Sequence, residues 1–441
     1  MKENKQARQW LEYPELRERF RILHHVSGLE IWLDYKEIRP TACYLLARFG
    51  SWHRRLKIGN KMVELPAGTA HFLEHKMFED ENGEDSLVLF SELGVDANAY
   101  TSAQRTCYQF FSTDHFEESL EILFRQVTQP HFTEESLSKE RKIIAEEIRS
   151  YADMHDYLSY MQLVGHVLDH HPERDDCCGS EESIERITPD ILYWCHKKFY
   201  HPNNLILSVC GRREDLDEDR ILALADRYFG TEPDRTRTPV RMDLPESTNL
   251  PKRSDTIRTQ MDVSRTFLTF GWKLPRPKPA SYWVSSTETC AMELLMAYLF
   301  SPSAELFSRL YEKQLLQTEP EYQFIRGKDF LLVCLQADCD PDRLRPLCLA
   351  IERGMKRVLA QGISEQALKP FKRTAVAEYI KDYDSTDCVA ENMALYASHS
   401  RGLQLYVRQI QRISAAMVQK LLDELLQTPH TLSLIEPKGA F

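Results

Sequence analysis

The chain has 441 residues, of which 42% are hydrophobic and 28% charged, and its formal net charge is −11. This length exceeds that of a usual single domain, so we expect two or more globular domains. The negative charge argues against a general binder of nucleic acid or of anionic membranes. No run of about eighteen apolar residues occurs, which argues against a membrane-spanning helix.

The first residues and the cysteines bear on the compartment. The stretch MKENKQARQWLEYPELRERF (1–20) is charged throughout and lacks the apolar core of a secretory signal. The eleven cysteines are scattered along the chain, and none has C-x-x-C spacing. Both features predict a reduced, cytoplasmic chain with neither a disulfide framework nor a cysteine zinc site.

In the first half, apolar stretches of strand character lie at 28–35 and 41–51, and a helix is predicted at 67–80. The stretch 98–113, rich in Thr, Tyr and Phe, is typical of a strand pair or of one long bent strand. Periodic apolar residues predict further helices at 116–128, 133–153, 157–168, 188–199 and 215–229. A strand is predicted at 203–211.

The sequence changes character after this half. Residues 231–255 hold four prolines and many charges without a helical period, which predicts a linker. The order of elements then repeats, with strands at 265–274, 330–337 and 431–437 and helices at 283–299, 303–315, 341–361, 364–381 and 386–400. We therefore predict an α+β fold of two similar domains, 1–233 and 256–441, joined by a linker at 234–255, each with helices packed on a mixed sheet.

The stretch HFLEHKMF (71–78) places two histidines four residues apart within the first predicted helix. Residues i and i+4 share one helix face, so His71 and His75 can both reach one metal ion. Such a pair is common by chance, and more often lies on a protein surface without a metal than binds one. Glu74 favours a metal, because it completes H-x-x-E-H, the zinc-protease motif H-E-x-x-H in inverted order.

A catalytic zinc needs a third protein ligand and an open position for water. The helix FTEESLSKERKIIAEEIRSY (132–151) offers Glu140 and Glu147, which fall within its apolar stripe, whereas Glu146 falls outside it. Two unpaired carboxylates in such a face would be costly to bury. A metal, a metal-bound histidine, a buried ion pair or a partly wet helix edge would each offset that cost. The stripe is formed by Leu137, Ile143, Ile144 and Ile148.

Together, His71, His75 and Glu147 form a set of two histidines and one carboxylate suited to Zn2+. Glu74 would then be the catalytic base, and Glu140 would hold a ligand imidazole through its other ring nitrogen. We expect the metal site in the first half, because the second half has no H-x-x-E-H and its histidines are His399 and His430.

These motifs resemble the pitrilysin, insulinase and mitochondrial processing peptidase family, the inverzincins. The matching stretches are HFLEHKMF, the E-x-x-x-x-x-x-E pair at 140 and 147, GVDANAYTSAQRTCYQF (94–110) and FYHPNNLILSVCG (199–211). Their order and spacing match throughout the first half. The length fits the short bacterial members, and a cytoplasmic insulinase-like protease is the most similar type.

The resemblance implies a zinc-dependent peptidase in which His71, His75 and Glu147 are the ligands and Glu74 takes a proton from the zinc-bound water. In relatives, the strand that corresponds to Asn98 and Ala99 pairs with the substrate backbone beside the metal. The resemblance also implies a homologous, inactive second domain.

The second half departs from the family pattern. Relatives carry an arginine and a tyrosine that help bind the substrate and the developing oxyanion, and the corresponding stretch here is SAELFSRLYEKQLLQTEPEYQF (303–324). An ungapped reading places Gln314 at the arginine position, and Tyr322 fits the tyrosine with a small shift. Arg309 and Tyr311 lie one turn earlier.

The leading hypothesis is a zinc endopeptidase that cleaves peptides or unfolded segments inside a chamber. A second, related chain would supply the missing arginine and tyrosine in a heterodimer; a homodimer or a monomer would suffice if Arg309, Tyr311 or Tyr322 shifts into place. The alternatives are a non-catalytic scaffold or assembly subunit of the same fold, and a structural zinc protein.

Overall fold

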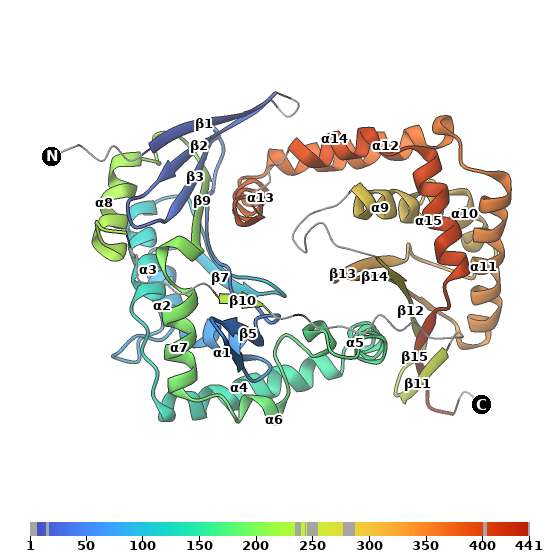
Figure 1. The fold of residues 1–441 in the computed structure, drawn as a ribbon, viewed down its shortest axis with the longest axis horizontal. Coiled ribbons are helices and arrows are strands. Elements are labelled where there is room, and N and C mark those ends of the chain that lie inside the picture. The colour runs from blue at the N-terminus through green and yellow to red at the C-terminus, as the bar shows by residue number, and fades with distance from the viewer. Residues whose placement is uncertain are drawn as a thin grey trace. The chain divides into compact units, whose positions relative to one another are not determined.

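The computed structural model describes residues 7–14, 17–233, 240–242, 244, 255–276, 287–399 and 404–439. The chain forms two compact units, each with its own sheet and helices (Figure 1). The first unit comprises Met1–Ile148, Asp176–Asp243 and Tyr379–Gln404, and the second comprises Arg149–Asp175, Leu244–Glu378 and Leu405–Phe441. The α+β fold with two sheet-containing parts is therefore confirmed.

The first unit is built on a mixed seven-stranded sheet. Among its described strands, only β3 and β9 pair in parallel, and the other neighbours are antiparallel. Its strands, in spatial order, are β1 (Ala7–Tyr13), β2 (Glu18–His24), β3 (Glu30–Tyr35), β9 (Leu205–Gly211), β4 (Thr41–Ala47), β8 (Thr106–Ser112) and β7 (Asp96–Thr101). A small sheet contains β10 (Val240–Met242), β5 (Arg55–Ile58) and β6 (Lys61–Glu64).

Both faces of the seven-stranded sheet are covered, because apolar side chains alternate between them along the central strands. On β4, Cys43 and Leu45 join one core, while Tyr44 and Leu46 join another. The first core packs under α1 (Thr69–Lys76), α2 (Ser86–Glu92), α3 (Phe116–Thr128), α4 (Glu134–Ala152), α6 (Glu181–Ile184), α7 (Pro189–Phe199) and α8 (Glu218–Phe229).

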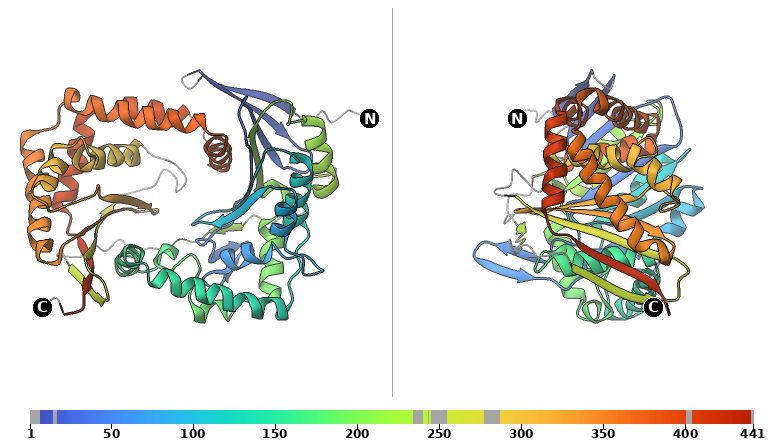
Figure 2. Two further views of the ribbon diagram at one scale, coloured as in Figure 1. Left: turned by 180° about the vertical axis from the view of Figure 1, so that it is seen from behind. Right: turned by 90° about the vertical axis from the view of Figure 1, so that its right-hand side faces the viewer.

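The other face is covered by α13 (Thr386–His399), which comes from the far end of the chain (Figure 2). Ala390, Met393 and Ala394 are fully buried against the sheet. The Ser208 hydroxyl donates a hydrogen bond of 2.5 Å to the carbonyl of Ala390, and Tyr100 donates one of 2.7 Å to Glu391. These contacts place residues 379–404 in the first unit.

The second unit contains a five-stranded sheet in the order β11 (Asp255–Met261), β15 (Thr431–Pro437), β12 (Thr266–Pro275), β14 (Phe330–Cys339) and β13 (Glu321–Arg326). One face packs its alternating apolar residues, such as Leu268 and Phe270, against helices. The second unit's helices on this side are α9 (Thr287–Phe300), α10 (Glu305–Glu312), α11 (Leu344–Gln361), α12 (Glu365–Lys381), α14 (Gln404–Arg412) and α15 (Ala415–Gln427).

The opposite face of this sheet is covered by α5 (His155–Val167), from the first half of the chain. The hydroxyls of Ser159 and Thr269 lie 2.8 Å apart and share a hydrogen bond. Leu163 packs directly over Gly271, where a Cβ atom would lie 2.5 Å from the leucine side chain. The absence of a side chain at Gly271 lets the helix approach the strand this closely.

The predicted continuous domains 1–233 and 256–441 require correction. Residues 149–175 belong to the second unit and residues 379–404 to the first, because the helices α5 and α13 bury their apolar sides on sheets formed by the other half of the chain. The predicted linker 234–255 lies mostly outside the described residues; its described part includes β10, Leu244 and the first residue of β11.

Among the described helices, none has the length and apolar character needed to cross a membrane.

We expect Gly271→Ala to destabilise the chain by about 1–3 kcal/mol, because the added methyl group would overlap Leu163. The matched control is Gly165→Ala on α5, where the nearest atom to an added Cβ is 3.5 Å away. Alanine favours a helix over glycine by about 1 kcal/mol, so this control should be neutral or stabilising. Thermal unfolding of both variants tests this; equal midpoints would contradict the close approach of α5.

Candidate metal site

The helix α1 carries the H-x-x-E-H motif and is almost entirely buried in the first unit. Gly68 precedes it with a φ of +82°, in the left-handed region that favours glycine. A Cβ atom on Gly68 would lie 2.3 Å from the carbonyl oxygen of Cys178. The start of α1 therefore lies close against the loop that contains Cys178, where only a residue without a side chain fits.

The side chains of His71, His75 and Glu147 converge from α1 and α4. Their closest ligand atoms all lie within 4.8 Å of one another. The Nε2 atoms of the two histidines are 3.3 Å apart, and each lies 3.6 Å from an oxygen of Glu147. A tetrahedral zinc ion with bonds of about 2.1 Å holds its ligand atoms about 3.4 Å apart. These separations fit such an ion.

The second nitrogen of each imidazole differs in its surroundings. Nδ1 of His75 lies 2.9 Å from an oxygen of Glu140, so a proton on Nδ1 leaves Nε2 with a free lone pair. Burial lowers the pKa of His75. The hydrogen bond to Glu140 and the nearby carboxylates raise it by more than burial lowers it, so the net shift of the pKa is upward. Nδ1 of His71 is buried and has no hydrogen-bond partner within the described residues.

His71 is 7% exposed. Burial, with a smaller contribution from the charge of His75, lowers the pKa of His71 to about 3. A neutral imidazole is the form that binds metals, so this environment suits a ligand.

Glu74 lies between the two histidines in sequence and is 6% exposed. Burial raises the pKa of its carboxyl group to about 7, and the hydrogen bond from Thr101 partly opposes this rise. That bond, from the Thr101 hydroxyl to Oε2 of Glu74, is 2.5 Å long. Since Thr101 ends β7, the carboxyl group is held in place by the edge strand of the sheet.

On α4, Glu140 and Glu147 are partly buried and face α1, while Glu146 is exposed. Thr133 accepts a hydrogen bond of 3.1 Å from the backbone N–H of Ser136 at the start of the helix, as expected of a cap. The predicted apolar stripe was wrong at Ile143, which is 57% exposed. The buried side of α4 is narrower than the sequence pattern indicated.

Cys178 is a neighbour of the site that the sequence reading missed. Its Sγ lies 3.8 Å from Nε2 of His71 and 4.0 Å from Oε1 of Glu147. Burial, followed by the nearby carboxylates of Asp176 and Glu147, raises the pKa of the thiol. The only signal in the sequence was the adjacent pair Cys177–Cys178, which has no metal-binding spacing.

Asn98 and Ala99 lie on β7, the outermost strand of the seven-stranded sheet, which pairs only with β8 among the described strands. Asn98 is exposed and accepts a hydrogen bond of 2.8 Å from the backbone N–H of Ala99. The predicted position at a sheet edge is thus present, close in sequence to the Thr101 that holds Glu74.

The residues considered for the arginine and tyrosine lie in the second unit. Gln314 follows α10 with a φ of +55°, and Arg309 pairs with Glu305 on the same helix. Tyr311 is 57% exposed. Tyr322 lies on β13 and lines a cavity of the second unit together with Glu293, Glu319 and Glu378.

Two family models match the chain. Residues 63–174, which include the convergent side chains, match "Insulinase (Peptidase family M16)", and residues 186–374 match "Peptidase M16 inactive domain". The "uncharacterized zinc protease YmfH" of Bacillus subtilis is 30% identical over 97% of this chain and 99% of its own length. The chain belongs to the insulinase family of peptidases.

Solved structures of similar fold support this assignment. An "M16-like peptidase" from Alicyclobacillus acidocaldarius is 25% identical and superposes over 97% of this chain and all of that chain, with a TM-score of 0.86. The periplasmic protease PqqL of Escherichia coli matches 97% of this chain but only 48% of its own length, at 18% identity and a TM-score of 0.72. One copy of this insulinase-family fold thus corresponds to about half of PqqL.

Proposed function

We propose that this protein is a zinc-dependent endopeptidase. The observation that carries the proposal is the convergence of His71, His75 and Glu147 to separations that fit one tetrahedral ion, beside the buried carboxyl group of Glu74. Relatives named zinc proteases support the metal. Three protein ligands, with the neighbouring carboxyl group of Glu74 outside the ligand set, suit an open catalytic site better than a structural one.

A zinc ion held by His71, His75 and Glu147 would supply a Lewis acid for peptide hydrolysis. Glu74 would accept a proton from the attacking water and deliver it to the leaving amine. Thr101 fixes the carboxyl group of Glu74 through its hydrogen bond, and Glu140 fixes the ring of His75 through Nδ1. The free edge of β7 at Asn98 and Ala99 would pair with the peptide backbone.

The partner is a further part of the proposal. Gln314, where relatives place a cation, cannot neutralise a developing oxyanion, and Arg309 is already paired with Glu305. PqqL, in which this fold matches about half of the chain, supports a working unit of two such halves. We therefore infer that a second, related chain supplies the arginine and tyrosine. The substrates of the proposed endopeptidase are peptides or unfolded segments.

The scaffold alternative has less support. A subunit without catalysis has no physical need for five ionisable side chains held together at the junction of α1, α4 and β7, since each buried polar group must be offset by partners. The five are His71, Glu74, His75, Glu140 and Glu147.

We expect about one zinc per chain, and Glu147→Gln should lose most of it, because a neutral amide is a poor ligand for zinc. The matched control is Glu146→Gln, which changes the adjacent, exposed carboxylate on the same helix. Elemental analysis of both purified variants gives the zinc content. Equal zinc in the two variants would remove Glu147 from the ligand set.

Glu74→Gln should keep the zinc and the fold but lower kcat by about 10²–10⁴-fold, because it removes a general base and no ligand. Cleavage of a quenched unstructured peptide measures the rate, and zinc content and thermal unfolding serve as controls. Activity within about tenfold of the unsubstituted chain, with zinc retained, would contradict the role of Glu74.

The chain alone should cleave peptides slowly, and a related chain that carries the arginine and tyrosine should raise the rate by about 10²–10³-fold, the usual contribution of one oxyanion donor. Size-exclusion chromatography of the mixture should show a complex of the two chains. Full activity of the isolated chain, without binding to the second one, would refute the heterodimer and leave the peptidase intact.

A further inference from the structure

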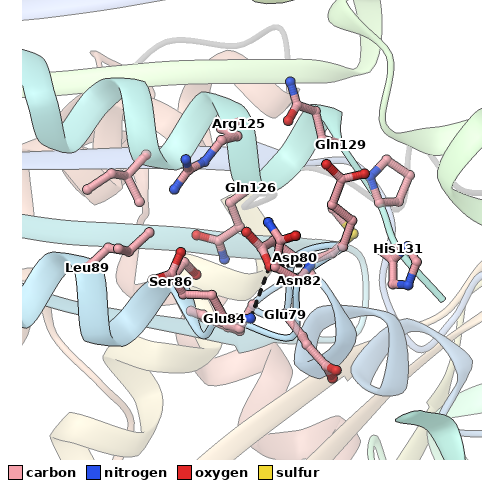
Figure 3. Close-up of a pocket in the computed structure, with 15 residues that line it drawn as sticks. Glu79, Asp80, Asn82, Glu84, Ser86, Leu89, Arg125, Gln126, Gln129 and His131 are labelled. Atoms are coloured by element: carbon pink, nitrogen blue, oxygen red, sulfur yellow. Dashed lines mark hydrogen bonds between the residues drawn. The ribbon is translucent and has the colours of Figure 1, made fainter. Parts of the chain in front are cut away.

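A cavity of about 340 Å³ in the first unit is separate from the metal ligands (Figure 3). It lies between the loop that follows α1 and the end of α3. Figure 3 shows Arg125 and Gln126 on the helix, across from Asp80, Asn82 and Glu84 of the loop. The volume is that of a site for a small molecule.

Two buried side chains on the wall of this cavity lack hydrogen-bond partners. Gln126 and Ser86 are each 7% exposed. Neither the Gln126 Nε2 nor the Ser86 Oγ has a hydrogen-bond partner within the described residues. A buried donor without a partner costs about 1–3 kcal/mol, so both atoms point to a polar group supplied by a bound molecule.

The helix side of the cavity is a donor surface. Arg125 is adjacent to Gln126 on α3 and adds a guanidinium group with a full positive charge. A carboxylate could accept hydrogen bonds from an arginine, an amide and a hydroxyl together, and bonds between charged groups are the strong ones.

The loop side is an acceptor surface. The Asp80 carboxylate is oriented by backbone N–H groups of Asn82 and Glu84, which donate to Oδ1 at 2.8 and 3.0 Å. The side chains of Glu84 and Asn82 add further oxygens to this wall. An ammonium group is the natural partner of such oxygens.

We infer that this cavity binds a small zwitterion, an α-amino acid or a dipeptide, with its carboxylate on Arg125, Gln126 and Ser86 and its ammonium group on Asp80 and Glu84. A simple anion would meet the repulsion of the loop carboxylates, since Glu79, Asp80, Glu81 and Glu84 all line the cavity. A simple cation would meet Arg125 and would leave the Gln126 N–H unpaired. Only a ligand that carries both charges satisfies both walls.

The cavity lies directly after the helix of the metal site. Met77 and Phe78 line it, and the backbone N–H of Ser86 donates a hydrogen bond of 2.8 Å to the carbonyl of Phe78. A bound ligand would therefore stabilise the segment that continues from His75. That the ligand is a product of peptide hydrolysis rests on the proposed function, whereas the binding itself does not.

The test is isothermal titration of alanyl-alanine into the full-length Glu74→Gln chain, in which the proposed catalytic base is absent. We expect saturable binding. The N-acetylated dipeptide, which lacks the ammonium group, and the dipeptide amide, which lacks the carboxylate, should each bind about tenfold more weakly or worse, since each loses charge-assisted hydrogen bonds.

Variants locate the site. In the same background, Arg125→Met and the nearly isosteric Gln126→Glu should each weaken binding of alanyl-alanine by about tenfold or more. Arg220→Met, the same change at an arginine outside this cavity, should leave the affinity unchanged. Thermal unfolding checks that each variant is folded.

Three results would overturn the inference: no saturable binding to the unsubstituted cavity, equal affinity for the capped dipeptides, or unchanged affinity in both the Arg125 and Gln126 variants. The last result would move any bound dipeptide to another site. Because peptidase activity is not measured, a failure of the proposed function leaves this test unaffected.

Discussion

The proposed site depends on one constraint, the packing of α4 against α1. Glu140 and Glu147 are seven residues apart, two helical turns, and meet two imidazoles that are one turn apart on α1. The 3.6 Å between Glu147 and each imidazole follows from this helix pairing, whereas the 3.3 Å between the imidazoles follows from their spacing on α1. At the start of α1, Gly68 lies close against the Cys178 carbonyl, so the first turn packs on the loop whose Cys178 thiol adjoins the site.

The same packing explains why a polar site can exist in an apolar core. Phe72 and Leu73 on α1 are fully buried, so the helix is anchored on its apolar side while the histidines face α4. The ionisable groups then find partners: Glu74 on Thr101, His75 on Glu140, and His71 on Glu147 and His75 through Nε2. One buried ring nitrogen of the site, Nδ1 of His71, has no hydrogen-bond partner among the described residues.

Helices with a clear apolar period, and the side chains that they bring together, were predictable from the sequence. The helix at 116–128 has the predicted bounds, and the convergence of His71, His75 and Glu147 follows from helical spacing and the need for a third ligand. The strands β1, β2, β5, β6, β11 and β13, the helices α2 and α6 and the C-terminal helices α14 and α15 were not predicted. Charged residues interrupt the alternation on exposed strands, so their pattern resembles that of a loop.

What the sequence could not show is which surface covers a given apolar face. The period of α5 and α13 predicts helices with a buried side, but not that each packs on a sheet built by the other half of the chain. Cys178 and the unpartnered atoms of Ser86 and Gln126 were missed for a similar reason. Their meaning comes from neighbours distant in the chain, and no local spacing records them.

The packing of α13 on a sheet from the first half of the chain has a consequence for folding during translation. When the ribosome has completed the seven-stranded sheet at Gly211, the sheet face with Tyr44, Leu46 and Ile206 lacks the cover of α13, which begins only at Thr386. The nascent chain must carry this apolar surface while residues 212–385, about two fifths of the chain, are translated. Exposed apolar surface promotes aggregation and chaperone capture. A chain truncated before Thr386 would keep the residues of the metal site and still lack one wall of the unit that holds them.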